Sequence, residues 1–183
     1  MKLIVAFLPW ILFGALSHRF PLAALLVALA SAAVQVAVHR HNPKILELVS
    51  LAFFIFDFVA LYLLRWATIG HYQGLLVHLL LASIAWGSLL AGTPFTLQYA
   101  RESVPRERWQ TPGFVRSNQL ITGVWGSDFI LQALVLQWQA AKGGMLASVF
   151  SVSFSALAIA FTLWYPERAR RQYELEMNTV NSH

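Results

Sequence analysis

The chain contains no cysteine and few charged residues. Among its 183 residues, 13 are lysine or arginine and 8 are aspartate or glutamate, so only 11% are charged. The lack of cysteine excludes disulfides, thiolate catalysis and metal sites with cysteine ligands. The scarcity of charge argues against a soluble domain, in which about 25% of residues are charged.

Recognisable catalytic motifs are also missing. The sequence has no glycine-rich phosphate loop, no H-E-x-x-H and no G-x-S-x-G. Serine and histidine occur, but at no spacing that argues for nucleophilic catalysis. We therefore expect a protein that is not an enzyme and holds no cofactor.

Apolar sequence, in contrast, is abundant, because 58% of the residues are hydrophobic. These residues form six runs, and all but the first are near the roughly 20 residues that a helix needs to cross about 30 Å of hydrocarbon. None alternates as a barrel strand does. The sequence predicts an all-α, polytopic membrane helical bundle in one domain, 1–183. The expected spans are 3–17, 20–38, 45–64, 73–95, 118–138 and 145–165, with a loop at 96–117 and a tail at 166–183.

The first run has a second interpretation. Lys2, an apolar stretch and then ALS at 15–17 resemble a secretory signal with a cleavage site. Pro9 and Trp10 are awkward in such a segment, and the distribution of charge favours its retention as a span.

Basic residues predict the orientation. With six spans, ten of the 13 lysines and arginines fall on the side of both termini, whereas Arg19, Arg65 and Lys142 fall on the other. Because basic loops remain in the cytoplasm, we expect both termini there. The net charge of +5 then indicates topology and attraction to anionic membrane lipids, not binding of nucleic acid.

Asp57 lies in the middle of the third expected span, within FFIFDF at 53–58. A charged carboxylate at mid-bilayer costs at least about 2.5–3.5 kcal/mol, so we expect it to face the bundle interior, protonated, paired or in a wet cavity. It is either a proton or cation relay or a group that fixes helix packing. Arg65, at the end of the same span, can reach the interface.

His71 and His78 lie seven residues apart, on one face of the fourth expected span. That spacing is about 10.5 Å along a helix, too far for two ligands on one ion, so no metal site is predicted. We expect His78 to be a buried hydrogen-bonding residue.

The fifth expected span is the most polar. Gly123 and Ser127 form a pair of small residues that allows close helix approach. Asp128 lies nearly a quarter turn away from the polar face. This span is either one wall of a substrate or ion site or a source of hydrogen bonds between helices. The residues sharing its polar face are Asn118, Thr122, Trp125, Phe129 and Gln132.

The loop before this span combines charge with aromatic residues, including Phe95, Tyr99 and Trp109. This composition is typical of a segment in the cytoplasmic interface, which either docks a partner or lipid headgroups or simply connects two spans. Pro105 and Pro112 prevent one continuous helix through it. The candidate docking residues are Arg101, Arg106, Arg108 and Arg116.

The order of these features resembles the bacterial intracellular septation protein A family of small inner-membrane proteins. The similar segments are FLPWILF at 7–13, ALLVA at 24–28, TPF at 93–95, VP at 104–105, RSNQL at 116–120 and VWG at 124–126. The chain departs from the family pattern by an insertion at 106–112 and by Asp57, Arg65 and Asp128. The resemblance implies a bacterial inner-membrane protein that supports the cell envelope and division through contacts with other membrane proteins, without established enzymatic chemistry.

Two interpretations of function follow. In the first, the chain is a non-enzymatic membrane bundle that acts through partners. In the second, it is a small transporter or channel subunit, with Asp57, His78 and Asp128 along a polar path, and two inverted halves of three helices. A membrane enzyme acting on lipids is a third, supported only by buried acids and histidine.

Overall fold

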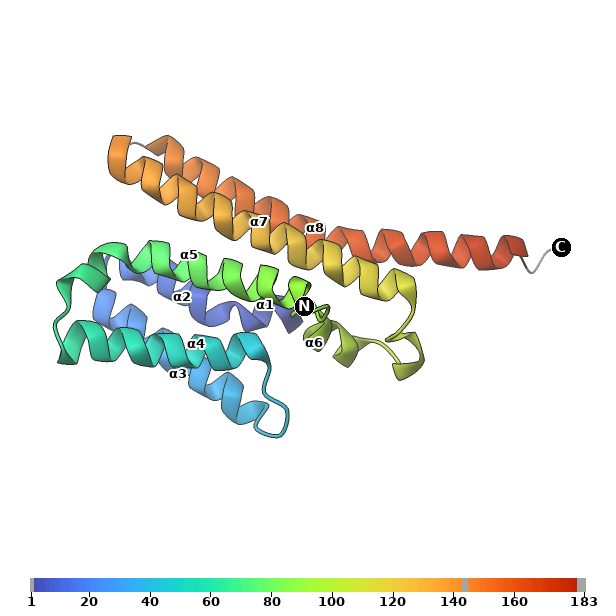
Figure 1. Cartoon of the computed structure of the whole chain (residues 1–183), viewed down its shortest axis with the longest axis horizontal. Coiled ribbons are helices and arrows are strands. Elements are labelled where there is room, and N and C mark those ends of the chain that lie inside the picture. The colour runs from blue at the N-terminus through green and yellow to red at the C-terminus, as the bar shows by residue number, and fades with distance from the viewer. Residues whose placement is uncertain (1, 143–144, 181–183) are drawn as a thin grey trace. The chain divides into compact units, whose positions relative to one another are not determined.

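In the computed structural model, every element is helical (Figure 1). The structure describes residues 2–142 and 145–180, with side chains described for 2–139 and 149–168. Residues 1 and 143–144 and the last residues of the expected tail, 181–183, therefore lie outside the described residues. The chain is divided into two compact units, Met1–Gly74 and Leu75–His183.

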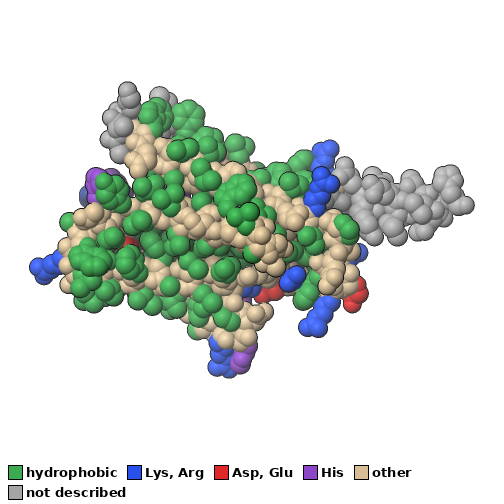
Figure 2. Space-filling view, viewed as in Figure 1, with side chains coloured by type: hydrophobic (Ala, Val, Ile, Leu, Met, Phe, Trp, Pro, Cys, Tyr) green, Lys and Arg blue, Asp and Glu red, His purple; other side chains and the backbone are tan. Residues whose placement is uncertain are grey.

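Among the described residues, five helical segments are long and apolar enough to cross a membrane, which confirms an all-α chain typical of a polytopic membrane protein. Figure 2 shows apolar side chains spread widely over the visible surface, with few charged side chains among them. The five segments are Pro21–Val38, Ile45–Leu63, Ala67–Leu90, Pro112–Gln139 and Val149–Arg168.

The first expected span is two short helices, α1 (Lys2–Ala6) and α2 (Leu8–Ser17). Helix α2 has ten residues, about 15 Å in length, which is half of the hydrocarbon thickness. Pro9 stands in its first turn, where a missing N–H costs little.

The first unit packs α2 against α3 (Pro21–Val38), and α3 against α4 (Ile45–Phe58). Ala24, Ala28 and Ala32 recur every four residues along α3 and are fully buried. Small side chains at this spacing let helices approach closely. An aromatic cluster joins α2 to α4, with the Trp10 ring centroid 4.7 Å from Phe54 and 5.2 Å from Phe53.

Helix α4 continues into a short π-helix, η1 (Val59–Leu63), two residues after Asp57. Arg65 then has a φ of 55°, a left-handed conformation that ends the helix before α5 (Ala67–Leu90) begins. Helix α5 begins six residues before the expected span because this break directly precedes it. It ends five residues early because Gly92, with φ of 70°, turns the chain.

The second unit contains the later part of α5, then α6 (Leu97–Ala100), two 3₁₀ turns, η2 (Arg101–Ser103) and η3 (Arg106–Arg108), and two long helices. These are α7 (Pro112–Lys142) and α8 (Met145–Val180), which pack side by side (Figure 1). Helix α7 begins six residues before the expected span because proline is tolerated at a first helical position. Helix α8 continues through Pro166, so the start of the expected tail is helical.

Within this unit, α5 and α7 approach closely at Gly126. A Cβ at Gly126 would lie 2.7 Å from Nε1 of Trp86, so only glycine fits without a shift of that side chain.

Candidate functional site

The polar face of α7 points into the protein, as the cost of polar groups in lipid predicts. Its members are buried, and Thr122 is fully buried. Whether they bind anything depends on which of their hydrogen-bonding groups are already used. The five residues are Asn118, Thr122, Trp125, Phe129 and Gln132.

One end of this face is hydrogen bonded to the preceding loop. The hydroxyl of Thr96 donates to the carbonyl of Asn118 at 3.0 Å and lies 2.8 Å from the Thr122 hydroxyl. Because the Thr96 proton is used toward the carbonyl, Thr122 is the donor between the two hydroxyls. The Asn118 amide in turn donates to the carbonyl of Phe114 at 2.8 Å.

The other end is hydrogen bonded to α8. The indole N–H of Trp125 donates to the Thr162 hydroxyl at 3.0 Å. The Gln132 amide donates to the Ser151 carbonyl at 2.8 Å and to the Ser155 hydroxyl at 2.9 Å, while its oxygen accepts from the Ser151 hydroxyl. These contacts use both amide protons of Gln132, and together with the Trp125 bond they join α7 to α8.

Asp128 belongs to the same cluster although sequence placed it off the polar face. Its side chain is buried, with Gln132 Nε2 lying 3.3 Å from Oδ1 and the Ser155 hydroxyl 3.4 Å from Oδ2. Both distances are long for hydrogen bonds. His78, half-buried on α5, lies within electrostatic reach of this carboxyl. The second unit thus brings together Asp128, Gln132 and His78.

Asp57 is fully buried in the first unit, which confirms the expected interior placement. Gln73 at the start of α5 donates to Oδ2, and Oδ1 has no hydrogen-bond partner in the described structure. A π-helix follows directly, a feature that often marks functional sites. The polar path expected to include Asp57, His78 and Asp128 stays a prediction, because the first of these lies in one unit and the other two in the second.

The loop from Ala91 to Thr111 is organised around Trp109. Its indole N–H donates to the Val104 carbonyl at 2.9 Å, and the guanidinium groups of Arg101 and Arg106 lie 5.3 and 5.6 Å from its ring centroid. Cations at this distance from an indole face are held by cation–π attraction. Arg101, Arg106 and Arg108 are all exposed.

The expected interfacial role of Phe95 and Tyr99 in this loop is wrong. Both are less than 5% exposed, as is Leu97 between them, so they pack inside the protein and do not anchor the loop in lipid. The polar contact of Thr96 with α7 draws this part of the chain inward.

Arg116 is separate from the other docking candidates. It lies on α7 and lines a groove of about 940 Å³ in the second unit. The groove is formed by α5, α7 and α8, and its lining is mostly apolar. The small pair predicted on α7, Gly123 and Ser127, lies along it, as does Asp128.

Sequence analysis missed a buried charge cluster at the start of α4. Glu47 and Lys44 are almost fully buried, with Nζ 3.8 Å from Oε1, and His39 Nδ1 lies 3.0 Å from the same oxygen. The Lys44 backbone N–H also donates to Glu47 at 3.3 Å. An acidic residue three positions after a helix start was the available signal, because it reaches back to cap the first turn.

No arrangement for a metal ion is seen in the described part of the chain, where no three histidine or acidic side chains converge. The comparisons with known proteins give no further identification: no family model, no curated protein and no solved structure matches this chain.

Proposed function

We propose that this chain is a non-enzymatic integral inner-membrane protein that acts through membrane-protein partners in cell-envelope maintenance or septation. The observation that carries the proposal is the use of the polar groups on α7. Asn118, Thr122, Trp125 and Gln132 direct their hydrogen bonds to the loop, to the backbone and to α8, which is the pattern of helix-to-helix attachment. A substrate would have to displace these bonds.

The basic loop supplies the surface for contact. Trp109 holds Arg101 and Arg106 by its ring, and three guanidinium groups remain exposed. Near an anionic membrane surface each such charge contributes about 1 kcal/mol of attraction. Arginine also forms paired hydrogen bonds with carboxylates, so an acidic segment of a partner protein suits the same surface.

The proposed topology has six spans with both termini in the cytoplasm, in a bacterial inner membrane. It rests on the uneven distribution of lysine and arginine. Reporter fusions after Gly143 and His183 are expected to report opposite sides of the membrane. A C-terminal fusion that behaves as periplasmic contradicts this topology.

The role in septation rests on the sequence resemblance alone. Its test is deletion of the gene in its own host, followed by measurement of cell length and of sensitivity to detergents. A deletion strain with normal length and normal resistance would refute the role, whereas defects restored by the wild-type gene support it.

The docking part of the proposal is tested by reversing charge in the loop. Arg106→Glu with Arg108→Glu is expected to abolish the complementation of the deletion strain while insertion and thermal stability persist. The matched control is Lys2→Glu with Arg40→Glu, which changes the charge equally at exposed positions on the same proposed side. Full complementation by the loop variant, or equal loss in the control, contradicts docking through this loop.

A small transporter or channel subunit is the second candidate, and Asp57 is the observation that favours it. A fully buried carboxyl with one unused oxygen, next to a π-helix, suits transient binding of a proton or cation. Proteoliposomes loaded with a pH-sensitive dye would reveal proton movement. Asp57→Asn would abolish it, and wild-type vesicles without any flux would exclude this candidate for protons.

A further inference from the structure

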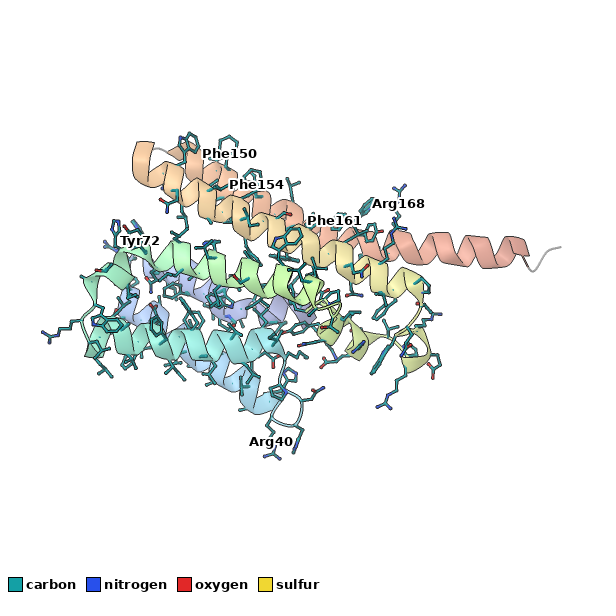
Figure 3. All side chains as sticks on the ribbon, viewed as in Figure 1. Arg40, Tyr72, Phe150, Phe154, Phe161 and Arg168 are labelled. Carbon is teal, nitrogen blue, oxygen red and sulfur yellow. The ribbon has the colours of Figure 1, made fainter. Side chains whose placement is uncertain are left out.

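The groove in the second unit combines an apolar floor with a basic end. The small residues Gly123 and Ser127 leave space at the base of the groove. Trp86 of α5 and Phe161 of α8 add large side chains to its lining. Figure 3 labels Phe154 and Phe161, which follow one another along α8 and both line the groove. A space of about 940 Å³ bordered by such side chains suits an extended apolar chain.

The positive charge lies at one end of this groove. Arg116, near the start of α7, is exposed and lines the groove together with Trp164, near the end of the apolar part of α8. The guanidinium of Arg168 lies 5.1 Å from the Trp164 ring centroid. Two cations and a tryptophan therefore mark the end that belongs at the membrane–water interface, where tryptophan is enriched.

The groove is long enough to hold the acyl chain of one leaflet. Along α7 its lining runs from Arg116 to Leu131, 15 residues or about 22 Å along the axis, and Asp128 lies 12 residues or about 18 Å beyond Arg116. Half of the hydrocarbon thickness is about 15 Å. An amphiphile with its charged group at Arg116 would thus place its chain beside Gly123 and Ser127 and end near the bilayer centre.

We propose that this groove is a binding site for an anionic phospholipid, with the phosphate at Arg116 and one acyl chain along Gly123 and Ser127. Charge complementarity selects this occupant. Arg116 makes no ion pair or hydrogen bond with another described residue, and a guanidinium binds a phosphate through two parallel hydrogen bonds. Gln119, one turn further along α7, also lines the groove and supplies an amide for the headgroup. The site goes beyond the proposed docking by the loop.

A second copy of the chain is the main competing occupant, because small residues also attract helices. The bulky side chains beside the floor oppose a flat helix contact, and a neighbouring helix offers no anion for Arg116. The absence of cysteine makes this alternative easy to measure, since Ser127→Cys introduces the only thiol in the chain.

The test is native mass spectrometry of the full-length protein in detergent, titrated with phosphatidylglycerol or with phosphatidylcholine of the same chains. The wild type is expected to bind phosphatidylglycerol more tightly. Arg116→Gln should weaken phosphatidylglycerol binding about fivefold and leave phosphatidylcholine unchanged, as loss of one charge of roughly 1 kcal/mol predicts. Ser127→Leu, which fills the floor, should weaken both lipids.

Matched controls separate the groove from the general surface. Arg40→Gln removes one exposed charge elsewhere, and Ser153→Leu adds the same bulk at an exposed position on α8 outside the groove lining. Both should bind each lipid as the wild type does. If Ser127→Leu does not fold, the phosphatidylglycerol binding of Arg116→Gln, a change at an exposed position, still tests the proposal.

Three results would overturn the proposal. These are equal binding of the two lipids by the wild type, undiminished phosphatidylglycerol binding by Arg116→Gln, and disulfide-linked dimers of Ser127→Cys in lipid vesicles. If the lipid titrations contradict the groove proposal, docking by the loop is unaffected. That proposal is tested by complementation with the Arg106 and Arg108 variants and not by lipid titration.

Discussion

The first unit keeps its buried polar groups apart, whereas the second arranges them along one helix. In the first, the Glu47 cluster, the Trp10–Ser50 hydrogen bond of 2.7 Å and the Asp57–Gln73 contact occupy separate places between aromatic or small side chains. In the second, hydrogen bonds follow α7 from Asn118 to Gln132 and connect it to the loop and to α8.

This difference has an energetic consequence. A buried charge with few neighbours depends strongly on its partner, since an uncompensated ion in a low dielectric is expensive. A line of neutral hydrogen bonds distributes the stabilisation over many weak contacts, each about 0.6 kcal/mol between helices in membranes. Loss of one partner should therefore be most costly at the buried ion pair of the first unit and least costly at a single hydrogen bond on α7.

The largest effect is expected from Glu47→Gln. The change keeps the shape and the capping oxygen but removes the negative charge beside buried Lys44, so the free energy of unfolding should fall by roughly 3 kcal/mol. Denaturant titration in lipid–detergent micelles, followed by circular dichroism, measures it. Glu167→Gln, at an exposed position, is the control. A loss no larger than that of the control would show that the cluster contributes little.

Gln132→Leu should have the next largest effect, because Gln132 joins Ser151 and Ser155 to α7 and supports Asp128. The loss of its three bonds to Ser151 and Ser155, at about 0.6 kcal/mol each, predicts a decrease of about 2 kcal/mol in the free energy of unfolding. Pairing it with Ser155→Ala in a double-mutant cycle gives the coupling. Strict additivity of the two changes would contradict a shared cluster.

Asp57→Asn should cost about 1 kcal/mol or less. The asparagine oxygen still accepts from Gln73, and the amide takes the place of the oxygen that has no partner. The measurement is the same unfolding titration, with Asp57→Leu as the comparison that removes the acceptor. A large loss for Asp57→Asn would mean that the carboxyl is charged and paired in the folded protein.

The elements that sequence analysis predicted well are those set by local physics. The long apolar runs became helices, Asp57 is inside because lipid exposure is costly, and the polar face of α7 follows from the helical period. The helix ends shifted where one residue decides the backbone, as at Arg65 and Gly92 with their left-handed conformations. Pro112 likewise began α7 and did not merely interrupt the loop.

The partners of side chains were not predictable in the same way. Thr96 contacts Thr122, 26 positions away in the sequence, and Trp125 contacts Thr162, 37 positions away. No local sequence pattern predicts either contact. Phe95 and Tyr99 suggested interfacial anchors by composition, but tertiary packing buries them. The groove beside Arg116 needs three helices in place before it exists, and the small pair at Gly123 and Ser127 was its only sign in the sequence.

The smallest effect is expected from Thr122→Val, although Thr122 is completely buried. Valine has nearly the shape of threonine, so the packing is kept and only the hydrogen bond to the Thr96 hydroxyl is lost. The Thr96 hydroxyl still donates to the Asn118 carbonyl, so no donor becomes unsatisfied, and the cost should be about 0.6 kcal/mol. Thr96→Val should cost more, because it also leaves that carbonyl without this donor. If Thr122→Val instead matches Glu47→Gln, then stabilisation in the second unit is concentrated at single contacts, and the contrast between the two units is wrong.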